Sequence, residues 1–203
     1  LYTLPRPTTI SDKQTKQVSL LSAATIPVRK ELLLQGSNYY YRSSVGEIGQ
    51  KLKPGVFVEF DNSDKSHLGV PLPKGVVRVY KRDSAGNAQF IGEDAIEHTA
   101  RNETVRLKLG DSFDVTADKK QTDFKIREQI LGRDVMESSF EIRIRNARAE
   151  TVSVVVREPI PGDWKMIAES APHRKVAAGT AEWTVAVPPE GETTLTYTTR
   201  VKF

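Results

Sequence analysis

The sequence contains no cysteine among its 203 residues. Without thiols the chain has no disulfides, no thiolate metal ligands and no cysteine nucleophile. It also has no apolar run approaching the about 20 residues that a helix needs to cross a bilayer, so we predict no membrane-spanning segment in this chain. The first residues do not have the pattern of a signal peptide, which indicates a processed chain or an excised fragment.

A block of like charge is missing too. The net charge is +4 and Lys and Arg are spread along the chain, so we predict no nucleic-acid partner. The nearest approach to a cationic stripe is Lys125 and Arg127 on one expected strand with Arg143 and Arg145 on the next. A solvated strand face that pairs with neighbouring carboxylates is the favoured interpretation of these four residues.

Metal and cofactor motifs are absent from the sequence. The histidines, His67, His98 and His173, lack the paired spacing of a zinc site. The acidic stretch Asp61–Asp64 matches no calcium-loop pattern, and turn chemistry accounts for it. No glycine-rich phosphate loop or dinucleotide fingerprint is present. We therefore predict no metal and no cofactor.

Two features raise the question of catalysis. The Gly-Asp-Ser triplet at 110–112 resembles the start of an esterase nucleophile block, but that chemistry also needs an Asp-x-x-His block, and His173 has no Asp three residues before it. The carboxylates Glu93, Asp94 and Glu97 lie close together in sequence, yet nothing marks two of them as the facing pair of a glycosidase. We therefore predict no catalytic residues, and a hydrolase is only the third hypothesis.

The pattern that is present is typical of β-strands. Val105, Leu107 and Leu109 alternate with Arg106 and Lys108, which indicates a half-buried strand. Similar alternations recur at turn spacings of about 8–14 residues, and no stretch has the periodicity and capping residues of a sustained amphipathic helix. The prediction is an all-β protein of two tandem antiparallel β-sandwich modules of the immunoglobulin-like kind, with little or no helix.

Hydrophobicity falls across residues 116–123 before strand patterning resumes at Phe124, so we place the boundary there. The predicted modules are residues 1–115 and 116–203. In the first module, the strand-like runs Val56–Phe60 and Val76–Tyr80 flank a long polar loop that prolines and glycines shape.

A small set of residues forms the predicted interaction surface. Tyrosine and tryptophan combine a flat apolar ring with a polar tip, which suits stacking on a sugar or contact with a protein partner as well as packing at the rim of a core. The candidates are Tyr39, Tyr40, Tyr41, His67, Leu68 and Trp164. By contrast, Trp183 is in register with Val185 and Val187, so we predict a core position for it.

Six segments distributed along the chain stand out as a set: LPRPTTISDKQTKQVSLL near the start, LGVPLPKGVVRVY at 68–80, IGED at 91–94, LGDSFDV at 109–115, REPIPGDW at 157–164 and LTYTTRV at 195–201. These segments resemble the C-terminal domain of bacterial mucoidy inhibitor A-like proteins. They span nearly the whole chain. The resemblance implies an extracytoplasmic location, in the periplasm or cell envelope, and supplies no catalytic residues.

The function predicted from these observations is a non-enzymatic structural or protein-interaction module of the bacterial cell envelope. Its partner is expected to be an envelope protein or polysaccharide, recognised by loops and exposed sheet edges. The alternative is a carbohydrate-binding module that uses exposed aromatic rings.

Overall fold

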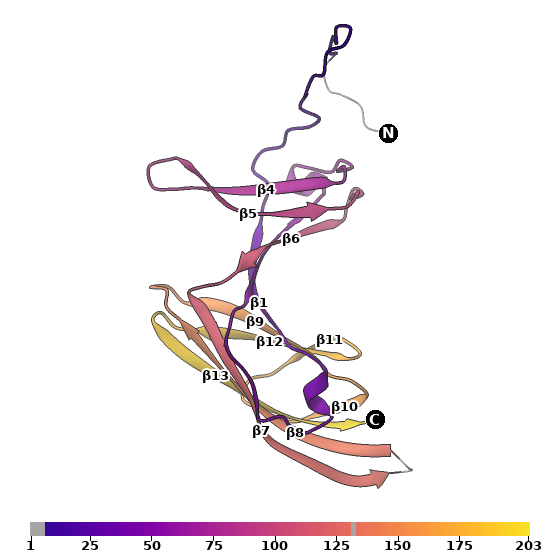
Figure 1. Ribbon diagram of the computed structural model, residues 1–203, viewed down its shortest axis with the longest axis vertical. Coiled ribbons are helices and arrows are strands. Elements are labelled where there is room, and N and C mark those ends of the chain that lie inside the picture. The colour runs from indigo at the N-terminus through magenta and orange to yellow at the C-terminus, as the bar shows by residue number, and fades with distance from the viewer. Residues whose placement is uncertain (1–6, 131–132) are drawn as a thin grey trace. The chain divides into compact units, whose positions relative to one another are not determined.

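The computed structural model describes residues 7–130 and 133–203, and these residues confirm the prediction of an all-β protein. They form thirteen strands and two single turns of 3₁₀ helix (Figure 1). The elements are β1 (Arg29–Gln35), η1 (Tyr39–Tyr41), β2 (Glu47–Leu52), β3 (Gly55–Asp61), η2 (Asp64–Ser66), β4 (Gly75–Arg82), β5 (Ala88–Ile96), β6 (Thr104–Asp111), β7 (Val115–Ile130), β8 (Arg133–Asn146), β9 (Val152–Pro159), β10 (Asp163–Glu169), β11 (Arg174–Ala177), β12 (Thr180–Val187) and β13 (Gly191–Lys202). No helix in this part of the chain has the length and hydropathy to cross a bilayer.

The strands form two main sheets and a separate hairpin. One sheet has six strands in the order β11-β12-β9-β1-β3-β6, and the other has five in the order β10-β13-β8-β7-β2. The hairpin consists of β4 and β5. The pairs β2–β7, β4–β5, β7–β8, β8–β13, β9–β12, β10–β13 and β11–β12 are antiparallel. By contrast, β1 runs parallel to β9, with Leu32 opposite Val154. This departs from the antiparallel prediction, because two strands so far apart in sequence are not held to opposite directions by a short turn.

The chain divides into two compact units that are not consecutive in sequence. The first unit contains the described residues up to 30 together with 58–108, and the second contains 31–57 and 109–203. Residues 31–57 thus pack with the C-terminal half of the chain. The predicted modules, residues 1–115 and 116–203, stay a prediction.

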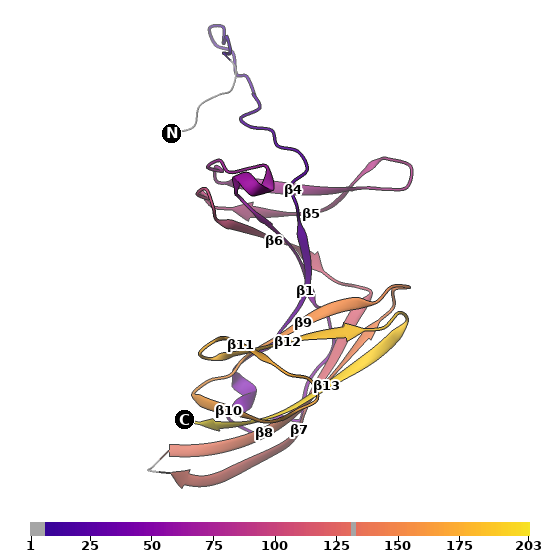
Figure 2. The same cartoon turned by 180° about the vertical axis from the view of Figure 1, so that it is seen from behind.

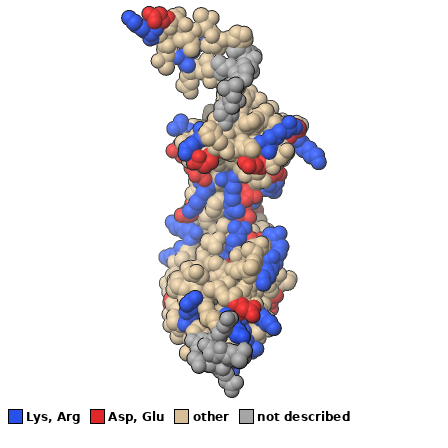
Figure 3. All heavy atoms as spheres, turned by 90° about the vertical axis from the view of Figure 1, so that its right-hand side faces the viewer, with Lys and Arg blue, Asp and Glu red and all other residues tan. Residues whose placement is uncertain are grey.

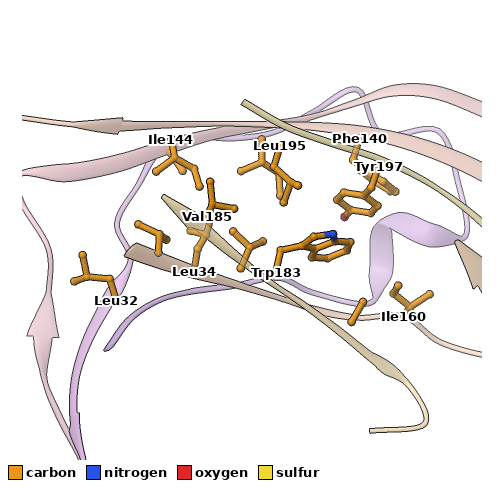
Figure 4. Close-up of a cluster of buried hydrophobic side chains, with 14 of the residues drawn as sticks. Leu32, Leu34, Phe140, Ile144, Ile160, Trp183, Val185, Leu195 and Tyr197 are labelled. Atoms are coloured by element: carbon orange, nitrogen blue, oxygen red, sulfur yellow. The ribbon is translucent and has the colours of Figure 1, made fainter. Parts of the chain in front are cut away.

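The second unit has a continuous apolar core between its two sheets (Figure 4). Alternate residues of each strand face it, as the sequence pattern indicated. On β8 the residues Phe140, Ile142 and Ile144 are all buried. On β12 the inward residues include Trp183, whose ring centroid lies 4.8 Å from that of Tyr197 on β13, so side chains from both sheets meet. The core prediction for Trp183 is confirmed.

The first unit is organised around the β4–β5 hairpin, which Figures 1 and 2 show as a ribbon of two strands. Its register runs from Gly75 opposite Ile96 to Arg82 opposite Ala88. A bulge between Val79 and Tyr80 in the pairing leaves one extra residue on β5. Residues 7–28 contain no strand or helix.

Candidate functional site

The outer face of the hairpin is apolar and exposed. Val76 and Tyr80 on β4 and Phe90 on β5 expose 59%, 56% and 55% of their surface. Tyr80 is paired with Phe90 across the strands, and their rings meet edge to face at 5.6 Å between centroids. Arg78 and Glu93, which are also opposite each other, form an ion pair of 2.9 Å on the same face. Large apolar side chains gathered in this way on a surface are typical of binding sites.

The opposite face of the hairpin is more buried. Val77 and Val79 on β4 and Ile96 on β5 are each half-buried, as expected for residues that alternate with the outer set. The carboxylate of Asp94 accepts a hydrogen bond of 2.8 Å from the backbone N–H of Lys108 on β6. The hairpin therefore presents one face to the first unit and the other to solvent.

The outer edge of β4 has free backbone groups. Among the described residues, β5 is the only strand that pairs with β4. No backbone hydrogen bond outside that pairing reaches Gly75–Arg82 in the part of the chain that the structure describes. An unpaired strand edge of this kind is a template for the addition of another strand.

Next to the start of β4 lies a groove of about 540 Å³ within the first unit. Its lining is mostly aliphatic. The residues of this apolar groove are Leu20–Ala23, Ile26, Phe60, Leu68, Leu72–Val77 and Ile96. The outer face of the hairpin and the groove share Val76, so the two adjoin at this residue, and the Arg78–Glu93 ion pair lies between Val76 and the Tyr80–Phe90 pair.

The loop that includes His67 and Leu68 is held in place by a buried asparagine. Asn62 is fully buried, and its side-chain amide donates to the carbonyls of Val70 (2.7 Å) and Ala100 (2.8 Å). His67 is exposed, with φ of 60°, and ends the short turn η2. Leu68 is half-buried and lines the apolar groove. Of these two candidates, Leu68 is the one that the structure brings to a cavity.

The tyrosines have different environments. Tyr39 exposes 53% of its surface, whereas Tyr40 and Tyr41 are buried, at 1% and 0%. The reason is the geometry of η1: a 3₁₀ turn advances about 120° per residue, so three consecutive side chains cannot share one face. Two of the three rings therefore pack inside the protein, and Tyr39 is the tyrosine of this run that a ligand could reach.

The two buried tyrosines belong to a polar cluster with Lys119, Glu158 and Tyr197. Lys119 and Glu158 form an ion pair of 2.6 Å, with 3% and 1% of their side chains exposed. The Tyr40 hydroxyl accepts a 2.6 Å hydrogen bond from Lys119 Nζ and donates to Glu158 Oε2. Tyr41 donates to the same Oε2 at 3.2 Å, and its oxygen lies 3.1 Å from that of Tyr197. Every charged or hydroxyl group of the cluster thus has a partner.

Burial controls the protonation of this cluster. Desolvation lowers the pKa of Lys119, although the adjacent Glu158 carboxylate opposes that effect. Desolvation and the same carboxylate raise the pKa of the Tyr40, Tyr41 and Tyr197 hydroxyls well above the ordinary value, so all three stay protonated. The cluster is closed to solvent and cannot receive a substrate from outside.

Trp164, on β10, is also largely buried, with 7% of its surface exposed. Its ring nitrogen donates to the carbonyl of Ala178 at 2.9 Å. Its ring lies 5.6 Å from that of His173, and Lys175 Nζ lies 4.8 Å from its centroid. The ring thus packs against residues 173–178, which follow β10 in the chain, and little of it faces solvent.

The Gly-Asp-Ser triplet spans the end of β6 and the start of the turn that follows, since Gly110 and Asp111 are the last residues of the strand. Ser112 is buried, its hydroxyl donates to Asp114 at 2.6 Å, and it accepts from the backbone N–H of Val115 at 3.2 Å. Asp114 also receives two hydrogen bonds from Arg148, at 2.7 and 2.9 Å. The serine hydroxyl stabilises this turn. Phe113 projects from it with 84% of its surface exposed.

The cations of the predicted stripe each have an acidic partner. The pairs are Lys125 with Asp123, Arg127 with Glu137 (3.0 Å), Arg143 with Glu141 (3.6 Å) and Arg145 with Asp118 (2.7 Å). Basic and acidic side chains also lie interspersed on the face that Figure 3 shows. Among the described residues, no three His, Asp or Glu side chains converge as a metal site would require.

Comparison with known families gives one match. The model of a domain of unknown function, DUF4139, matches residues 1–203. The chain belongs to the DUF4139 family. No curated protein and no solved structure matches it.

Lys119 and Glu158, two residues of the polar cluster in this chain, were not among the candidates predicted from the sequence. Lys119 follows Val115 and Ala117 at alternate positions of β7, and all three are buried. Glu158 likewise continues the buried series of Val154 on β9. Strict period-2 alternation was therefore the signal for both. It was missed on β7 because the polar residues between 116 and 123 suggested a linker.

Proposed function

We propose that this DUF4139 domain is a non-enzymatic protein-interaction module of the bacterial cell envelope, and that it binds an extended segment of an envelope protein along β4. The observation that carries the proposal is the hairpin itself: a strand with a free edge, an exposed apolar face that includes Val76, Tyr80 and Phe90, and an adjoining apolar groove. In strand addition, backbone hydrogen bonds supply affinity and pockets for alternate side chains supply specificity.

The charge of β4 favours an acidic partner strand. Arg78, Lys81 and Arg82 lie on β4, and the strand has no acidic residue. Like charges directly opposite each other destabilise a strand pair. A second copy of β4 would bring these cations together, whereas a strand with Asp or Glu at facing positions would pair with them.

Two finer assignments belong to this proposal. The first is kinship with the C-terminal domain of mucoidy inhibitor A-like proteins, which is the basis for the envelope location. The second is a description of the chain as tandem immunoglobulin-like β-sandwiches. The face-to-face sheets and shared core of the second unit support that description for residues 31–57 and 109–203.

The carbohydrate-binding alternative depends on rings that a sugar can reach. Stacking requires an exposed ring face. Tyr40, Tyr41 and Trp164 are buried, so Tyr39 is the exposed ring among the residues predicted from the sequence to form an interaction surface. Nothing in the surroundings of Tyr39 favours a sugar over a protein, so we retain the protein partner.

The proposal is tested in two steps. A photo-crosslinking amino acid at position 80 or 90 of the full-length protein, in cells, identifies the contacting envelope protein. The purified partner is then titrated with the domain. The double variant Tyr80→Ser/Phe90→Ser should weaken binding at least about tenfold, because most interface energy rests on a few aromatic anchors.

The control is Ile126→Ser, which removes an exposed apolar side chain (68%) from the second unit. It should leave the affinity unchanged. A partner whose affinity is the same for the double variant and wild type contradicts the proposal. So does binding of purified envelope polysaccharide that is lost in Tyr39→Ser, which would support the carbohydrate alternative.

A further inference from the structure

The polar cluster of the second unit joins the two sheets. Lys119 lies on β7 of the five-stranded sheet and Glu158 on β9 of the six-stranded sheet. Their side chains meet in the core, with Nζ and Oε1 2.6 Å apart and almost no exposed surface. A buried amine and a buried carboxyl in contact are the two reactants of amide formation.

We propose that Lys119 and Glu158 condense to an intramolecular amide that crosslinks the two sheets. Nζ of Lys119 attacks Cδ of Glu158, the Nζ–Cδ bond forms, and the Cδ–Oε2 bond breaks. Oε1 remains as the amide carbonyl oxygen, and Oε2 leaves as water with two protons. An amine and a carboxylic acid give an amide and one water, so the step needs no oxidant, reductant or other reagent.

Tyr40 is the catalytic residue of this step, because its hydroxyl contacts both reacting groups. It accepts a hydrogen bond from Nζ (2.6 Å) and donates one to Oε2. It can therefore pass a proton to the leaving oxygen while it receives one from the attacking nitrogen. The backbone N–H of Ser37 donates to the same hydroxyl at 2.7 Å and fixes its position.

A second tyrosine polarises the carboxyl group. Tyr41 donates to the same leaving oxygen, Oε2, at 3.2 Å, and so stabilises the negative charge on that oxygen as the Cδ–Oε2 bond breaks. The hydroxyl of Tyr41 is itself held by Tyr197, 3.1 Å away. Because all three tyrosines are in place before the reaction, they need no reorganisation.

The surroundings favour the amide over the ion pair. Nζ of Lys119 lies 4.0 Å from the ring centroid of Tyr40, 5.4 Å from that of Phe140 and 5.9 Å from that of Tyr197. Burial disfavours the charged form of Lys119 and lowers its pKa, which favours the uncharged, nucleophilic amine, although the ring faces themselves attract an ammonium group. Burial also keeps out the water that would reverse the reaction. Condensation replaces two buried charges with one neutral group, which removes a desolvation cost.

Gly36 leaves room for the polar cluster because it has no side chain. A side chain at Gly36 would overlap both Glu158 Oε2 and the Tyr40 hydroxyl. Glycine at this position therefore lets the reacting atoms sit together. The proposal rests on the cluster alone and does not depend on the protein-interaction function.

The test is the intact mass of the folded, purified chain under denaturing conditions. The amide makes wild type lighter than its sequence mass by one water, about 18 Da, a covalent change that unfolding does not reverse. A protease digest should contain one branched peptide that joins the segments around Lys119 and Glu158. Lys119→Met should have its full sequence mass.

Tyr40→Phe keeps the ring and removes the hydroxyl, so it should slow the conversion at least about tenfold and give a mixture of both masses that changes with time. Tyr39→Phe, the exposed neighbour, should convert like wild type. Wild type that is folded by circular dichroism and keeps its full sequence mass after days at 37 °C would overturn the proposal. The cluster would then be an ion pair only.

Discussion

The two units of this chain treat apolar side chains in opposite ways. The second unit packs most of its large apolar residues into one core and encloses even the charged pair Lys119–Glu158 among rings, although Phe113 and Ile126 are exposed. In the first unit Val76, Tyr80 and Phe90 expose more than half of their surface on a hairpin that neither main sheet extends. The second unit thus covers most of its apolar surface, whereas the first exposes an apolar cross-strand pair.

This difference separates stability from recognition. Exposed apolar area contributes nothing to the folding free energy of the chain that carries it, but it is available to a partner. Substitutions in the second unit should therefore change stability, and substitutions on the hairpin should change binding. Three variants, from the largest expected effect to the smallest, examine this separation.

Trp183→Ala should destabilise the second unit by about 3–5 kcal/mol, because it removes the largest core side chain and leaves a cavity. The ring is 1% exposed, and its nitrogen donates to Glu169 (3.0 Å) and to the carbonyl of Ala171 (3.1 Å). Urea unfolding followed by circular dichroism measures the change. A loss below about 1 kcal/mol would mean that the core repacks and that the contrast between the units is overstated.

Asp114→Asn should cost on the order of 1–2 kcal/mol at neutral pH, because it breaks the paired hydrogen bonds with Arg148. The hydrogen bonds from Arg148 hold the pKa of Asp114 well below its usual range. A carboxylate with a lowered folded-state pKa stabilises the protein fully above its unfolded pKa of about 4, and this contribution is lost as the pH falls further.

The melting temperatures of wild type and Asp114→Asn should therefore differ by a constant amount above about pH 5 and converge below about pH 4. Thermal melts between pH 7 and pH 2 give both curves. A difference that stays constant down to pH 2 would show that the ion pair with Arg148 does not contribute.

Tyr80→Ser and Phe90→Ser, alone or together, should change the free energy of unfolding by no more than about 0.5 kcal/mol each, because more than half of each residue is exposed to solvent. The measurement is again urea unfolding. A large destabilisation would show that the Tyr80–Phe90 contact holds the hairpin together, and the binding experiment would then need single substitutions at Val76.

Alternation in the sequence was sufficient to predict several of the strands and part of the core, but not the start of β7. Phe140, Ile142 and Ile144 on β8 are buried as their spacing indicated, and so are Trp183 and Val185 on β12. Side chains on a pleated strand alternate between faces whatever their partners are, so this property can be read locally.

Long-range pairing could not be predicted in the same way. Nothing in Arg29–Gln35 indicates that it pairs parallel with β9, because the two strands are joined by no turn whose residues specify their register. The tyrosine run was interpreted from the sequence as part of an interaction surface, yet η1 places Tyr40 and Tyr41 against a buried pair that lies far along the chain. Their role depends on Lys119 and Glu158, which alternation could place inside but could not bring together.

The parallel pairing of β1 with β9 also sets an order for synthesis. Leu32–Gln35 pair with Val154–Arg157, so β1 leaves the ribosome well before its partner exists. The hairpin residues 75–96 lie between the two and make only local pairings, so they can fold first. During translation the chain should therefore carry a finished hairpin while β1 has its neighbour β3 on one side and an open edge on the side that β9 later occupies. That interval is when this edge of β1 most needs protection from other chains, because an unpaired strand edge is a common starting point of aggregation.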